Sequence, residues 1–84
     1  MTPVVLKAPN GLHARPANQV VQEANKFQAT VHVIKDNRNY NAKSIIALMS
    51  AGFIMGETIF IQAEGTDACE AEAALAQLIA TIID

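Results

Sequence analysis

Four short segments of the chain are predicted to be β-strands, either from their Val, Ile and Leu content or from an alternation of apolar and polar residues. They are Thr2–Lys7, Ala29–Lys35, Tyr40–Ala42 and Glu57–Ala63. In the second segment Val31 and Val33 share one face, and in the fourth Ile59 and Ile61 do the same, because side chains alternate along a strand. A turn at residues 36–39 is expected to join the second and third segments as a loose hairpin.

Two further segments carry apolar residues three and four positions apart, the spacing of one face of an α-helix. The first helix is expected to begin close to His13 or Ala14 and to run for about three turns, because Pro16 belongs in a first helical turn. The second helix is short, and Ser44 precedes it as a suitable N-cap.

A third helix is predicted near the end of the chain, with Thr66 or Asp67 as its N-cap. Its apolar face is formed by Ala68, Ala71, Leu75, Leu78 and Ile82. The order of elements is then βαββαβα, which predicts an α+β fold in one domain over residues 1–84. Strands with one apolar face and helices with one apolar stripe favour a four-stranded, mostly antiparallel sheet with three helices on one face.

Composition narrows the functional class. The chain has 84 residues, of which 51% are apolar, and a single cysteine, which excludes a disulfide framework and a cysteine-based zinc site. Its net charge is −2, so binding to nucleic acid is not expected. All six bases and only two of the eight acids lie in residues 1–43, so this half is basic. No apolar run is long enough to span a bilayer, and no targeting signal is visible, so we expect a cytoplasmic protein.

The segment Asn10–Ala17 holds the candidate chemistry. It places His13 at a helix start, where free backbone N–H groups form a ready anion site. The positive end of the helix disfavours imidazolium, which leaves a ring nitrogen available as a nucleophile. Arg15 can bind phosphate oxygens, so the spacing fits reversible phosphoryl transfer through histidine. The alternative is that His13 is an N-cap or an ordinary surface residue.

The block Gly11-Leu12-His13-Ala14-Arg15-Pro16-Ala17 resembles the active-site signature of the HPr family, the histidine-containing phosphocarriers of the bacterial phosphoenolpyruvate-dependent sugar phosphotransferase system. The likeness continues in Lys43-Ser44-Ile45-Ile46 and in the strand and turn from Gly56 to Gly65, and it covers essentially the whole chain. The order of elements agrees with the open-faced β-sandwich of that family.

The resemblance implies a carrier that is a substrate of other enzymes and not an enzyme itself. His13 would take a phosphoryl group on Nδ1 from phospho-enzyme I and pass it to IIA domains of sugar permeases. Arg15 would be the second catalytic residue, because it neutralises phosphate charge. The resemblance places phosphate contacts at Ala14, Arg15, Pro16 and Ala17. It implies no cofactor, no metal and a monomer.

The resemblance also implies a regulatory phosphorylation at Ser44 by an HPr kinase/phosphorylase, with a catabolite-control transcription factor as a further partner. The alternative for Ser44 is a plain helix cap. A short helix this apolar cannot bury every side chain, so we expect a partner-binding patch beside His13, with Ile46 as its most exposed member. The predicted patch consists of Leu12, Lys43, Ile45, Ile46 and Met49.

Three other functions remain in view. The first is a regulatory HPr paralogue that binds a transcription factor or kinase, although paralogues of that sort lack the active histidine. The second is an HPr of the nitrogen-related branch, which the segment Asn41–Ser44 does not favour. The third is a small enzyme of the acylphosphatase kind, which a single arginine beside a histidine fits poorly.

Overall fold

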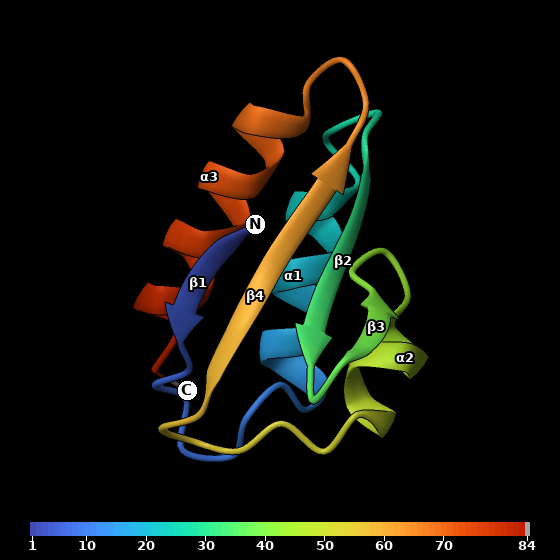
Figure 1. Cartoon of the computed structure of the whole chain (residues 1–84). Coiled ribbons are helices and arrows are strands. Elements are labelled where there is room, and N and C mark those ends of the chain that lie inside the picture. The colour runs from blue at the N-terminus through green and yellow to red at the C-terminus, as the bar shows by residue number, and fades with distance from the viewer. Residues whose placement is uncertain (84) are drawn as a thin grey trace.

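Four strands form an antiparallel sheet in the spatial order β1-β4-β2-β3 in the computed structural model, which describes residues 1–83 (Figure 1). They are β1 (Thr2–Val5), β2 (Thr30–Lys35), β3 (Arg38–Asn41) and β4 (Thr58–Glu64). Val4 pairs with Ile59 across β1 and β4, and Val33 pairs with Ile61 across β2 and β4. All three pairings are antiparallel, so the predicted sheet is confirmed.

The helices are α1 (Ala14–Ala24), α2 (Ile45–Ser50) and α3 (Ala68–Thr81), which confirms the predicted order of elements. Helices α1 and α3 cover one face of the sheet, and α2 packs against α1 beside the edge strand β3 (Figure 1). The opposite face of the sheet has no helix over it among the described residues (Figure 1).

The core lies between the sheet and the helices. Val31, Val33, Ile59 and Ile61 are fully buried, as their alternation predicts. Helix α3 differs in detail from the prediction, because its fully buried residues are Ala71, Leu75 and Ile79, and Leu78 is only half-buried. Leu78 and Ile79 are adjacent and both apolar, so a periodicity of 3.6 residues accommodates either of them on the inner face.

The β2–β3 hairpin is tighter than expected. Its turn consists of Asp36 and Asn37 alone, with φ values of 52° and 64°. Both residues lie in the left-handed region, which suits a two-residue turn whose twist matches that of the strands. Asp and Asn enter this region more readily than most residues, so the dipeptide itself carries the signal.

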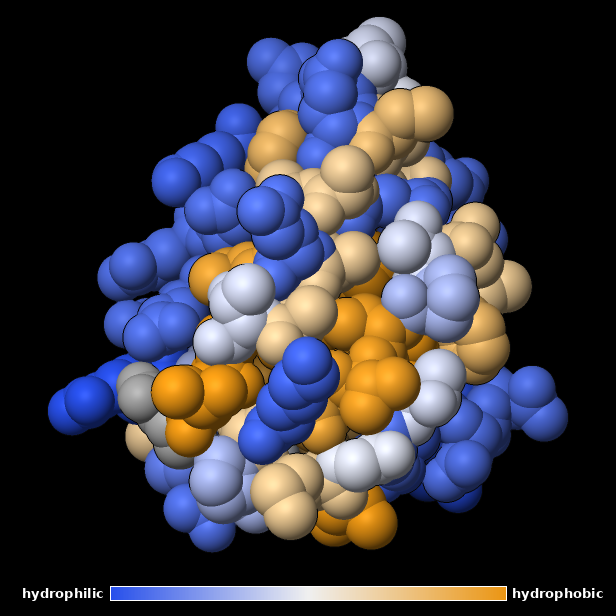
Figure 2. Space-filling model, turned by 90° about the vertical axis from the view of Figure 1, so that its left-hand side faces the viewer, coloured by the Kyte–Doolittle hydropathy of each residue, from blue (hydrophilic) through white to orange (hydrophobic). Residues whose placement is uncertain are grey.

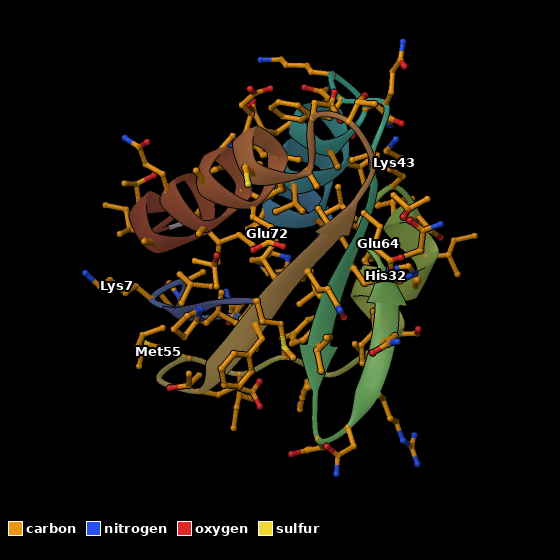
Figure 3. The ribbon with its side chains drawn as sticks, turned by 45° about the horizontal axis from the view of Figure 1, so that its top comes forward. Lys7, His32, Lys43, Met55, Glu64 and Glu72 are labelled. Carbon is orange, nitrogen blue, oxygen red and sulfur yellow. The ribbon has the colours of Figure 1, made fainter. Side chains whose placement is uncertain are left out.

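Two carboxylates of the α3 segment bind the backbone of other elements. Asp67 was predicted as a side-chain cap, but it makes no cap hydrogen bond. Its carboxylate accepts hydrogen bonds from the N–H groups of Gln28 (2.9 Å) and Ala29 (2.8 Å), which lie between α1 and β2. These amides, the Gln28 group foremost, lower the pKa of Asp67 below its ordinary value. Glu72 likewise accepts a hydrogen bond from a backbone N–H, that of Ala63 on β4. Figure 3 shows Glu72 pointing from α3 toward the sheet.

Candidate functional site

His13 stands directly before the first residue of α1, as predicted. Its backbone is extended (φ −92°, ψ −166°), and its carbonyl oxygen accepts a hydrogen bond from Ala17 N–H at 2.8 Å. The side chain makes no cap hydrogen bond and is exposed. The imidazole therefore takes no part in holding the helix, which removes the side-chain N-cap interpretation of this histidine.

The two residues before His13 hold its backbone in place. Gly11 has φ +67°, and a Cβ at this position would lie 1.9 Å from the carbonyl oxygen of Phe53. Leu12 is 3% exposed and packs in the core. The prediction that Leu12 contacts partners therefore does not agree with the structure, since a buried side chain offers no docking surface.

The first turn of α1 presents Ala14 and Arg15, which are both exposed. Amide groups in a first turn have no acceptor within the helix, so Ala14 N–H points out of the helix end beside His13. Pro16 has no N–H, and the N–H of Ala17 is donated to the His13 carbonyl oxygen. Neither residue therefore has a backbone N–H left to donate to a phosphate group, and both are buried in the first turn.

Ser44 caps α2, because its Oγ accepts a hydrogen bond from Ala47 N–H at 3.2 Å. This confirms the predicted cap. The helix that follows buries Leu48 and exposes Ile45, Ile46 and Met49, with Ile46 the most exposed at 77%.

Lys43 is placed differently from the α2 side chains. Its ammonium donates a hydrogen bond to the carbonyl oxygen of Phe27 at 2.8 Å, so its charge is directed at the segment after α1. Figure 3 shows Lys43 near the start of α2. Ile46 is thus exposed as predicted. The Lys43 ammonium, in contrast, already binds a backbone carbonyl within the chain.

Two exposed apolar residues were missed as candidates. Ile54 and Met55 lie in the 52–57 loop, which joins α2 to β4, and they are 63% and 58% exposed. Met55 points away from the core (Figure 3). In Figure 1 this loop runs beside the segment that leads to His13, and Figure 2 shows apolar surface gathered toward the same end of the molecule. The sequence signal for this exposed surface was a run of apolar residues between Gly52 and Gly56 that has neither the period of a strand nor that of a helix.

The charge split along the sequence does not become one basic face. Lys26 follows the C-terminus of α1, at the opposite end of the helix from Arg15, and pairs with Glu23 at 3.0 Å. Lys35 pairs with Glu57 at 3.2 Å. Bases of the first half are therefore spread over the molecule, and two of them are matched by nearby acids.

The comparison with known families decides the identity of this arrangement. The family described as "PTS HPr component phosphorylation site" matches residues 2–81. The chain belongs to the HPr family. Relatives of this family that are named phosphocarrier protein HPr, together with the family model, support a carrier of phosphoryl groups rather than a catalyst.

Relatives within the HPr family include proteins named phosphocarrier protein HPr and an HPr-like protein named Crh. The chain is 44% identical over 64 residues to phosphocarrier protein HPr of Buchnera aphidicola, covering 76% of this chain and 75% of the relative. It is 46% identical over 76 residues to HPr-like protein Crh of Halalkalibacterium halodurans, covering 90% of each. Crh of Bacillus subtilis, whose solution structure is 43% identical to this chain with a TM-score of 0.75, is named a catabolite repression HPr, which fits a link to carbon catabolite regulation.

Solved HPr structures share the fold. The crystal structure of phosphocarrier protein HPr from Bacillus anthracis has a TM-score of 0.86 and 46% identity, covering 93% of each chain. An HPr dimer from Thermoanaerobacter tengcongensis has a TM-score of 0.75 and 47% identity, covering 90% of this chain and 87% of that one. Because a dimer of the family has been solved, the expectation of a monomer stays a prediction. No helix within residues 1–83 is long and apolar enough to cross a membrane.

Proposed function

We propose that His13 is the phosphoryl-accepting residue, and that the chain carries the group from phospho-enzyme I to IIA domains of sugar permeases. The exposed imidazole at the N-terminus of α1, with no cap hydrogen bond of its own, is the observation that carries this proposal. A histidine with a structural role would be expected to hold a hydrogen-bond partner or to be packed against neighbours.

The chemistry follows from the helix end. Nδ1 of neutral His13 attacks the phosphorus atom, a nitrogen–phosphorus bond forms, and the bond between phosphorus and the donor breaks. The added negative charge lies beside the positive end of α1 and the backbone N–H of Ala14, an exposed residue. The Arg15 guanidinium, on the same turn, supplies a second source of positive charge. Transfer to the next protein reverses these steps.

The test is phosphorylation by enzyme I and phosphoenolpyruvate, followed by intact mass measurement before and after acid treatment. We expect a gain of one acid-labile phosphoryl group, which is absent in His13→Ala. His32→Ala is the matched control, because His32 lies on β2 and should not affect labelling. Failure of the wild-type protein to accept the group would refute the proposal.

A second proposed function is regulation through Ser44, which the likeness to Crh favours. Phosphorylation of Ser44 by an HPr kinase/phosphorylase would place negative charge at the start of α2 and favour binding to a catabolite-control transcription factor. The test is ATP-dependent, acid-stable labelling by such a kinase. Label that persists in Ser44→Ala would rule out this site.

A further inference from the structure

Lys35, at the end of β2, contacts three groups of the 52–57 loop. Its ammonium donates a hydrogen bond to the carbonyl oxygen of Gly52 at 2.8 Å and pairs with Glu57 Oε2 at 3.2 Å. It also lies 5.6 Å from the centre of the Phe53 ring. The Lys35 and Glu57 side chains are only 16% and 18% exposed, so water and salt screen this pair less than a surface pair.

Glu57 holds the same loop from its other end. Its second carboxylate oxygen, Oε1, accepts a hydrogen bond from Ile54 N–H at 2.9 Å. Its backbone carbonyl accepts one from Leu6 N–H at 3.0 Å, and Gly56 N–H donates to the Leu6 carbonyl oxygen at 2.7 Å. The loop is therefore tied at Gly52, Ile54, Gly56 and Glu57, although it is neither helix nor strand.

This loop connects the two parts of the site. On one side, Gly52 directly follows Ala51, the C-cap of α2, so the Lys35 ammonium complements the negative end of the helix that carries Ile46. On the other side, the Phe53 carbonyl oxygen lies against Gly11, two residues before His13. A shift of the loop would change the position of α2 relative to the backbone that presents the histidine.

We propose that Lys35 and Glu57 are positioning residues for phosphoryl transfer. The pair holds the 52–57 loop in one arrangement, and the loop sets the spacing between the exposed apolar face of α2 and the segment that carries His13. This inference rests on the proposed function of His13. Neither residue touches the phosphoryl group, so their effect is on docking: without the pair, the donor must order the loop when it binds, and that cost weakens binding.

The test compares Lys35→Met with Lys26→Met in phosphorylation by enzyme I. Both substitutions remove one positive charge from a lysine paired with a glutamate, but Lys26 is 68% exposed and its pair with Glu23 lies at the C-terminal end of α1. We expect Lys35→Met to raise KM about fivefold with kcat changed less than twofold, because the docked geometry is the same once formed. Lys26→Met should leave both values near those of the wild type.

Two more variants separate positioning from a simple ion pair. Lys35→Arg keeps donors for both Gly52 and Glu57 and should restore KM. The double exchange Lys35→Glu with Glu57→Lys keeps the charge pair but loses the donor to the Gly52 carbonyl and the acceptor for Ile54 N–H. It should therefore retain the raised KM, and full recovery in this variant would overturn the proposal.

Amide hydrogen exchange provides a readout that needs no partner protein. In Lys35→Met the amides of Ile54 and Gly56 should exchange faster, while amides within α3 keep the wild-type rate and show that the fold is intact. Unchanged exchange at Ile54 together with an unchanged KM would refute the positioning role. If the wild-type protein accepts no phosphoryl group, the proposed function fails, and exchange still decides whether the pair holds the loop.

Discussion

The carboxylate of Glu72 on α3 accepts a hydrogen bond from the backbone N–H of Ala63 on β4, at 3.0 Å. Ala63 lies beyond the part of β4 that β1 covers, because β1 pairs only with Thr58 through Ile61. The other carboxylate oxygen accepts a hydrogen bond from the hydroxyl of Thr2 at 2.9 Å and lies 3.6 Å from the N-terminal ammonium. Glu72 thus supplies an acceptor where β4 extends beyond β1, and it links α3 to both strands.

Replacing Glu72 with Gln should lower the free energy of unfolding by about 1 kcal/mol at pH 7, through the loss of hydrogen bonds to a charged group. The amide donor of Ala63, with the Thr2 hydroxyl and the N-terminal ammonium, lowers the pKa of Glu72 below its ordinary value of 4.5. A lowered pKa means that the carboxylate stabilises the fold above that value and loses this effect as the pH falls through the folded-state pKa.

Denaturant unfolding of both proteins across the pH range checks this expectation. The stability difference between wild type and Glu72→Gln should be full at pH 7 and should shrink as the pH falls below 4.5. Glu70→Gln is the control, because Glu70 is exposed in the first turn of the same helix. An equal effect of the two substitutions would show that the Ala63 and Thr2 contacts do not contribute.

Gly11→Ala should be one of the more damaging single substitutions in the chain. The new Cβ would lie 1.9 Å from the Phe53 carbonyl oxygen, and the backbone at φ +67° already disfavours a side chain. We expect a loss of about 3 kcal/mol in stability, or a shifted loop, and slower phosphorylation of His13.

Gly52→Ala separates backbone strain from the clash at Gly11. Gly52 has a similar φ of +73°, but nothing lies within 4 Å of the added Cβ, so only a conformational cost of about 1–2 kcal/mol is expected. Denaturant unfolding and the rate of phosphorylation measure both variants. Equal losses in the two would mean that the approach of Phe53 to Gly11 is not needed to position the histidine.

Local patterns in the sequence predict most of the fold. The alternation around Val31 and Val33 identifies the inner face of a strand, and Pro16 places the start of α1 at the observed position. The same local rules identify Ser44 as the cap of α2. Each of these depends on neighbours within a few residues, where backbone geometry and side-chain period leave few choices.

Contacts between distant parts of the chain could not be predicted in the same way. Asp67 and Glu72 are acids of the kind found near the start of a helix. Their carboxylates, however, accept hydrogen bonds from backbone N–H groups up to 39 residues away in the chain. The ion pair of Lys35 and Glu57 likewise could not be predicted, because it forms only when the fold brings β2 and the 52–57 loop together. The local motif around His13 was evident in the sequence, whereas the loop that fixes its surroundings was not.

Ser44→Ala should lower the free energy of unfolding by about 1 kcal/mol, because the Ala47 N–H loses its acceptor. Ser44→Asp keeps an acceptor at the cap and should retain most of the stability. Thermal or denaturant unfolding distinguishes the two variants. If both lose the same stability, the Ser44 hydroxyl does not act as a cap in solution.

Ile46→Thr should weaken phosphorylation by enzyme I without weakening the fold. The side chain is 77% exposed, so the substitution removes apolar surface that is available to a partner and leaves the core unchanged. Loss of one to two buried methylene equivalents on docking, at about 0.8 kcal/mol each, corresponds to about a four- to fifteenfold fall in kcat/KM. Val5→Thr is the matched control, since Val5 is exposed on β1 and the substitution is of the same kind. An equal fall in kcat/KM for both variants would show that the exposed face of α2 has no special role in docking. A fall confined to Ile46→Thr, with an unchanged free energy of unfolding, would identify this face as the partner surface.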